Sequence, residues 1–182
     1  SHARETNDAG LQKQIEQSLA NIEKIMGKKF GDEKSPLLLS VRSGARRSMP
    51  GMMETVLNVG LTEKTIKGLI ESTGDERFAY DAYRRLITMY ADVVMEKAGG
   101  LEPAKGKGIR KLMDELLSET KSKNGYKSDT ELTVPQLKDL VKEYKTLIKK
   151  YLKSEFPEDP WKQLMGGIGA VFSSWNGKRA IE

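Results

Sequence analysis

The sequence predicts an α+β protein that is predominantly helical. Five segments repeat apolar residues every three or four positions, which is typical of amphipathic helices. One short apolar run, Leu37–Leu39, follows Pro36 and indicates a buried strand. A lone strand would leave its backbone hydrogen-bonding groups unpaired. A partner strand is therefore expected, either from chain outside this sequence or from residues 52–61, which fit a strand or an irregular segment.

The first predicted helix covers residues 6–26 and ends at Gly27. Its apolar stripe consists of Leu11, Ile15, Leu19, Ile22 and Met26. A shorter helix is expected between Thr62, which would cap it, and Gly74.

The strongest helix prediction begins with a capping box. Thr73 and Glu76 have the Thr-x-x-Glu spacing, in which each side chain binds a backbone amide at the other position. An apolar face then continues through Met95, and Gly99 and the next glycine end the helix. A further amphipathic helix is predicted over residues 109–122.

Two more helices complete the pattern. Thr133 and Pro135 begin one that runs to Leu152, because proline is tolerated in a first helical turn. Pro160 begins the last one. Its predicted inward face consists of Trp161, Leu164, Met165, Ile168, Val171, Phe172 and Trp175. Three glycines lie within it, at positions 166, 167 and 169. Since glycine weakens a helix, they indicate either a close backbone approach or a weak point.

The composition excludes several classes of function. Cysteine is absent and the single histidine, His2, lies in a Ser-His-Ala start that resembles a cloning scar. Histidine nucleophiles, zinc sites and disulfides are therefore not expected. The chain has 31 Lys and Arg against 26 Asp and Glu, and the two signs alternate along the helices, which argues against nucleic-acid binding. No apolar run is long enough to span a membrane, and a cytoplasmic protein is expected.

Residues 40–53, SVRSGARRSMPGMM, fit no regular element. They follow the predicted strand and combine serine, glycine, arginine and proline in one turn-prone segment. Free backbone amides and the guanidinium fork suit phosphate oxygens. The same composition also fits a solvated structural turn, so the residues alone leave both interpretations open.

Three blocks resemble the nucleotide-binding domain of the pyruvate phosphate dikinase family. They are SVRSGARRSMPGMMETVLNVGL, TGDERFAYDAYRRLITMYADVVM and FPEDPWKQLMGGIGAVFSSWNGKRAI, in the family's order. The SGAR-x-SMPGMM continuation resembles the phosphate-dependent enzymes more than the dikinases that use water. Residues 96–129 agree less well with the family.

The resemblance implies a reaction, a fold and two cofactors. The family converts ATP, phosphate and pyruvate into AMP, pyrophosphate and phosphoenolpyruvate through a phosphohistidine in another domain. The implied fold is a partial ATP-grasp-like domain: a lobe at residues 4–61, a helical subdomain at 62–156 and a returning helix at 157–182, after a scar at 1–3. ATP and Mg²⁺ are the implied cofactors, with the metal ligands outside this sequence.

The resemblance also implies site residues. Arg42 matches the family's VRS arginine, which contacts ATP phosphates, and Arg46 matches a second arginine. Ser43 and Gly44 would shape the same ATP- and phosphate-binding loop, although Arg42 and Arg46 also fit surface or structural roles.

Four further residues are second-rank candidates. Met49 and Met53 could line an adenine pocket, although core packing also explains them. Arg84 and Arg85 could reach a phosphate, or could form ion pairs with acids such as Asp81.

The family's glycine-rich loop with its lysine, its metal-binding carboxylates and its phosphohistidine and pyruvate domains are not in this sequence. The resemblance therefore implies no catalytic residue and no metal site here, and no turnover by this chain alone. Its expected partners are ATP and the phosphohistidine domain of the same full-length chain, with a homodimeric parent. The alternative is a helical protein-interaction module that binds no nucleotide.

Overall fold

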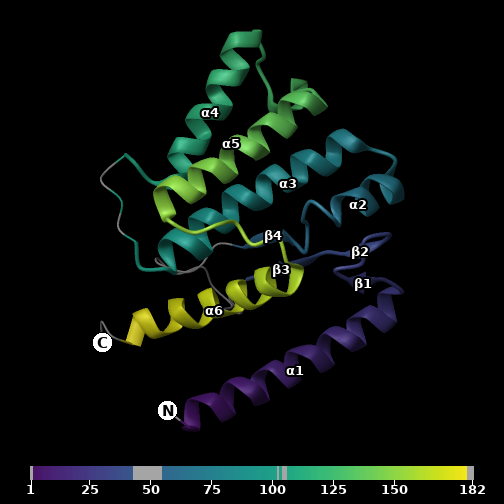
Figure 1. Cartoon of the computed structure of the whole chain (residues 1–182), viewed down its shortest axis with the longest axis vertical. Helices are drawn as coiled ribbons and strands as arrows, with labels where there is room; N and C mark the ends of the chain where they lie inside the picture. Colours follow the sequence, from purple (N-terminus) through teal and green to yellow (C-terminus); the bar gives the residue numbers. More distant parts are fainter. Residues whose placement is uncertain (1, 43–54, 102, 104–105, 180–182) are drawn as a thin grey trace.

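A computed structural model describes residues 2–42, 55–101, 103 and 106–179, with side chains described between residues 10 and 173 of those ranges. Helices dominate it, as the periodicity predicts. One of two short strand pairs lies between the C-terminal helix α6 (Pro160–Arg179) and the helices drawn above it, and the other lies to the right of α6, near the end of the N-terminal helix (Figure 1). The N-terminal helix α1 (His2–Met26) lies on the far side of α6 from those upper helices.

Four short strands form two separate pairs. Strands β1 (Lys29–Phe30) and β2 (Pro36–Leu37) are parallel. Strands β3 (Leu39–Val41) and β4 (Val56–Val59) are antiparallel. The predicted run 37–39 is thus divided at Leu38, and residues 52–61 do supply a strand. The pairing of β4 with β3 satisfies backbone hydrogen-bonding groups that a single strand would have left unpaired.

The upper helices surround a shared apolar core. They are α2 (Ile66–Thr73), α3 (Glu76–Tyr90), α4 (Ile109–Asn124) and α5 (Val134–Leu152), with the short 3₁₀ turn η2 (Asp129–Glu131) before α5. Helix α3 is central, since it contacts β4 and also packs along α5. Its Tyr83, Leu86 and Ile87 are fully buried.

Three helix starts test the predicted caps. Thr62 does not cap the helix that follows it, because α2 begins at Ile66 and its N-cap is Thr65. Thr133 accepts a hydrogen bond from the Gln136 amide, and Gln136 reciprocates, so the predicted helix start at Thr133 is confirmed. The Thr73–Glu76 box is wrong: Asp75 caps α3 by accepting from the Phe78 amide. Thr73 belongs to the previous helix, because Gly74 takes a left-handed conformation (φ 68°) and ends α2 between them.

Two other expectations need correction. The helix predicted through Met95 is α-helical only to Tyr90, and continues as a π-helix, η1 (Ala91–Lys97). A π-turn inserts one residue per turn and shifts the phase of the side chains. Phe172, expected to face inward, is 38% exposed, whereas Leu164 and Val171 are buried as predicted. The side chain of Trp175 lies outside the described residues.

Candidate functional site

Arg42 stands where β3 ends. Val41, the residue before it, is buried and pairs with Val56 of β4, which is fully buried. The apolar core therefore fixes the strand end, while the side chain of Arg42 is exposed. Among the residues that the structure describes, no carboxylate forms an ion pair with Arg42. Within the described part of the chain, its guanidinium is therefore open to a ligand from solvent.

The chain between Arg42 and Thr55 joins two neighbouring antiparallel strands. The candidates Ser43, Gly44 and Arg46 lie in this connection. So do Met49 and Met53. All five lie outside the described residues, so the structure places only Arg42 of the predicted loop set.

Helix α6 supports the strand pair from below. The side chain of Gln163 is fully buried and accepts a hydrogen bond from the Gly60 amide (2.9 Å) just after β4. It also donates to the carbonyls of Leu61 and Pro157, both at 2.8 Å. One turn later, Gly167 lies against Val41. The predicted close backbone approach in α6 is confirmed.

Arg84 and Arg85 both form ion pairs with the carboxylate of Asp81. Arg84 is buried, and its Nη2 lies 2.9 Å from Oδ1 of Asp81. Arg85 is half exposed, with its Nε 3.4 Å from Oδ2 of the same residue. Burial lowers the pKa of Arg84, but the hydrogen bond and negative charge of Asp81 outweigh it and raise the pKa overall. This geometry favours the ion-pair alternative for both arginines.

A charged cluster that the sequence reasoning missed lies between α3, α5 and the start of α6. Lys145 Nζ lies 2.6 Å from a carboxylate oxygen of both Glu63 and Glu158. The Tyr83 hydroxyl donates to Glu158 (2.8 Å), and burial together with that carboxylate raises the pKa of Tyr83. The members come from four separate segments of the chain, so no local sequence pattern could have revealed them. Each charge is paired, which indicates a structural network beside a cleft of about 360 Å³.

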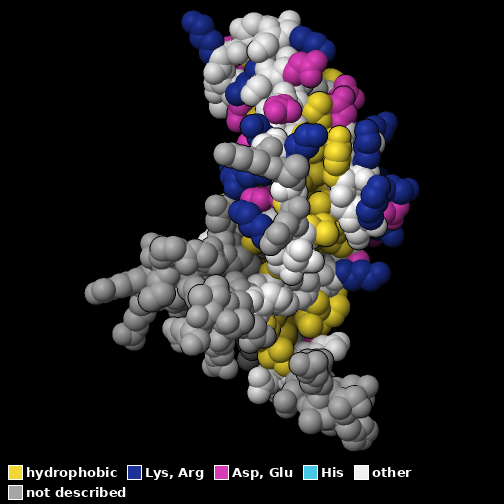
Figure 2. Space-filling model, turned by 90° about the vertical axis from the view of Figure 1, so that its left-hand side faces the viewer, with side chains coloured by type: hydrophobic (Ala, Val, Ile, Leu, Met, Phe, Trp, Pro, Cys, Tyr) yellow, Lys and Arg dark blue, Asp and Glu magenta, His cyan; other side chains and the backbone are white. Residues whose placement is uncertain are grey.

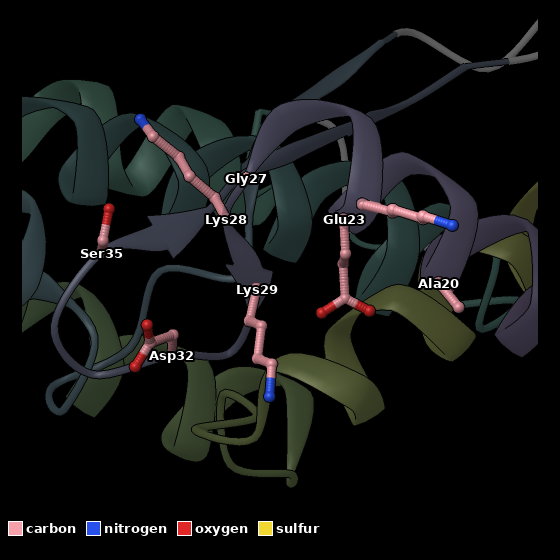
Figure 3. Close-up of a pocket in the computed structure, with 8 residues that line it drawn as sticks. Ala20, Glu23, Gly27, Lys28, Lys29, Asp32 and Ser35 are labelled. Atoms are coloured by element: carbon pink, nitrogen blue, oxygen red, sulfur yellow. The ribbon is translucent and has the colours of Figure 1, made fainter.

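A cleft of about 540 Å³ lies where α1 meets β1 (Figure 3). Lys28 and Lys29 extend to opposite sides, and the carboxylates of Glu23 and Asp32 lie on the side of Lys29. Glu23 also accepts a hydrogen bond from the Phe30 amide (3.1 Å) and so ties α1 to β1. The mixture of signs gives this cleft no preference for an anion.

Charges of both signs are intermingled at the height of α3, α4 and α5 (Figure 2). The coloured part of that face shows no continuous basic patch of the kind that nucleic acid needs. Within the described ranges, no group of three metal-binding side chains is placed to hold an ion, and no helix is long and apolar enough to cross a membrane.

Comparisons with known proteins agree with the VRS and SMPGMM motifs. The family model for the AMP/ATP-binding domain of pyruvate phosphate dikinase matches residues 4–182, which include the divergent stretch 96–129. Pyruvate, phosphate dikinase of Rhizobium meliloti is 47% identical over 172 residues, or 94% of this chain. The Clostridium symbiosum protein is 45% identical over the same length, and the chloroplastic protein of Mesembryanthemum crystallinum 47% identical over 174 residues.

The chain spans only 17–18% of the length of these relatives. The match nevertheless covers nearly every residue of this sequence, including the strand that ends just before Arg42 and the helix that supports it. The chain belongs to the pyruvate phosphate dikinase AMP/ATP-binding domain family.

Proposed function

We propose that this chain binds the phosphates of ATP at the end of β3, as part of a pyruvate phosphate dikinase. One observation carries the proposal: Arg42 is exposed directly after a buried, paired residue, and it opens the long connection to β4. A strand end anchored in the core holds a guanidinium at a defined place. The donor fork of arginine then matches two phosphate oxygens at once.

The rest of the ATP site would come from the segment that follows Arg42. In this proposal, Arg46 and the backbone amides around Ser43 and Gly44 add donors for the phosphates, and Met49 and Met53 contact the adenine ring. Triphosphate chemistry needs a cation to offset phosphate charge, so Mg²⁺ would bind with the nucleotide. Its ligands would come from chain beyond this sequence.

The proposed reaction is the one for which the relatives are named. ATP and phosphate would give AMP and pyrophosphate at this domain, with a phosphoryl group passed to a phosphohistidine domain of the same protein and then to pyruvate. This proposal includes the ATP-grasp-like fold, with a lobe that ends at residue 61 and a helical subdomain that ends at residue 156. It also includes the homodimeric parent and its cytoplasmic location.

A second candidate function rests on α1. Ile25 is 82% exposed and Met26 is 57% exposed at the end of that helix, next to the half-exposed Ile22. Such a patch suits contact with another protein surface. A helical protein-interaction module would use this patch and would need no nucleotide.

Titration calorimetry of ATP with the intact protein tests the proposal. Arg42→Ala should weaken ATP binding by roughly 10- to 100-fold, the value of one charge-assisted contact. Arg42→Lys should recover part of the affinity, since it keeps the charge but loses the fork. Lys67→Ala removes an exposed charge on α2 and should bind ATP as the parent does. Unchanged ATP affinity in a folded Arg42→Ala protein would overturn the proposal and favour the interaction module.

A further inference from the structure

Gly166, Gly167 and Gly169, which lie close together in α6, have different surroundings. A Cβ added at Gly169 would meet nothing within 4 Å. One added at Gly166 would overlap the hydroxyl of Tyr90 on α3. One added at Gly167 would lie 3.3 Å from a methyl of Val41, and 3.4 and 3.5 Å from its other two side-chain carbons. The absence of a side chain at Gly167 thus brings the helix backbone against the last residue of β3.

Neither partner in this contact can move freely. Val41 is buried, pairs with Val56, and has a β-branched side chain with few rotamers. Helix α6 is held one turn earlier, where Gln163 binds Gly60. The closest of these contacts, at 3.3 Å, is tighter than nine in ten real Cβ contacts, so a methyl at Gly167 would press on Val41 and displace it by a few tenths of an ångström.

The residue after Val41 is Arg42. A shift of Val41 moves the backbone from which the Arg42 side chain starts, whereas a change at Gly169 does not touch β3. Ligand contacts depend steeply on placement, and about 1 Å of error can cost two orders of magnitude in rate.

We propose that Gly167 is a positioning residue, which sets the end of β3 so that Arg42 meets the phosphates of ATP. The role rests on the proposed function, because it acts through Arg42. Gly167 itself need not touch the nucleotide.

The test compares alanine at the two glycine positions in the intact protein. Gly167→Ala should weaken ATP binding about three- to tenfold, because the displacement is well below 1 Å. Its melting temperature should stay within a few degrees of the parent, since alanine favours helix and offsets the tighter contact. Gly169→Ala makes the same chemical change in open space and should leave ATP affinity unchanged.

A second substitution provides the readout that a purely structural role would not give. In Gly167→Ala, the further change Val41→Ala removes the methyls that the new Cβ would press, and should restore most of the ATP affinity. Val41→Ala alone lowers stability by leaving a gap.

Equal ATP affinity of Gly167→Ala and Gly169→Ala would overturn the proposal, as would a loss that Val41→Ala does not relieve. The Arg42→Ala protein separates this failure from that of the proposed function. If Arg42→Ala weakens ATP binding and Gly167→Ala does not, only the positioning role is wrong. If Arg42→Ala binds ATP normally, both are wrong.

Discussion

The side chain of Gln163 on α6 accepts the backbone N–H of Gly60, 103 residues earlier, at 2.9 Å. The same amide group donates to the carbonyls of Leu61 and Pro157. One fully buried side chain thus satisfies three backbone groups and holds α6 to the end of β4.

Gln163→Leu should destabilise the protein by about 2–4 kcal/mol, because leucine fills a similar volume but leaves these buried groups unpaired. Urea unfolding measures the change. Lys162→Ala, at the exposed neighbouring position, should cost less than about 0.5 kcal/mol. Similar losses for both variants would contradict the described hydrogen bonds.

Gly166→Ala should destabilise by about 1–3 kcal/mol, because the new methyl overlaps the buried Tyr90 hydroxyl. Tyr90→Phe in the same protein should recover much of that loss by removing the oxygen. Gly169→Ala should instead stabilise by up to about 1 kcal/mol. Thermal unfolding of the three variants measures their order of stability. Equal stability of Gly166→Ala and Gly169→Ala would contradict the prediction.

Glu96 caps a helix to which it does not belong. Gly108 provides no side chain at the start of α4, and the buried carboxylate of Glu96 accepts the Ile109 amide at 2.8 Å. Glu96→Ala should cost about 1–2 kcal/mol, and Glu96→Gln less, since its amide oxygen can still accept. Hydrogen exchange should show faster exchange of the Ile109 amide in Glu96→Ala. Unchanged protection there would contradict this capping role.

Asp129 gives a pH-dependent contribution to stability. A hydrogen bond from Lys121, whose Nζ lies at 2.8 Å, lowers the pKa of Asp129 below its ordinary 3.8. When the pKa of a carboxyl group is lower in the folded protein than in the unfolded chain, its ionised form stabilises the folded protein at a pH above the pKa of the unfolded chain. This stabilisation is lost as the pH falls through the pKa of the folded protein. Because the carboxylate is 45% exposed, Asp129→Asn should cost less than about 1 kcal/mol at pH 7.

That difference should shrink as the pH falls below 3.8. Urea unfolding between pH 2 and 7 measures it, with Asp139→Asn, an exposed aspartate of α5, as the control. A stability difference that stays constant over this range would count against the Lys121 contact.

The elements that follow from local chemistry were predictable from the sequence. The helix start at Thr133 depends on residues within one turn, and the structure confirms it. The glycines of α6 correctly indicated a close approach, although only the fold shows that Val41 and Tyr90 are the neighbours. The Thr73–Glu76 pattern gave a wrong prediction. Gly74, two residues before α3, takes a left-handed conformation and ends α2, so Asp75 is the residue that caps α3.

Features that depend on distant contacts could not be predicted. Nothing in the spacing of Glu63, Lys145 and Glu158 indicates that they meet. The change from α- to π-helix after Tyr90 has no composition signal. Of the candidate site, the motif predicted Arg42 at a strand end, and the structure confirms that position. Its contact with ATP stays a prediction.

The most direct measurement is of the two partial reactions in the intact protein. If ATP chemistry takes place at the end of β3, Arg42→Ala should slow the exchange between ATP with phosphate and AMP with pyrophosphate by a hundredfold or more, roughly 3 kcal/mol. The exchange between phosphoenolpyruvate and pyruvate should be nearly unchanged, because the proposal assigns it to another domain. An Arg42→Ala protein that melts normally and loses neither exchange, or loses both equally, would contradict the account.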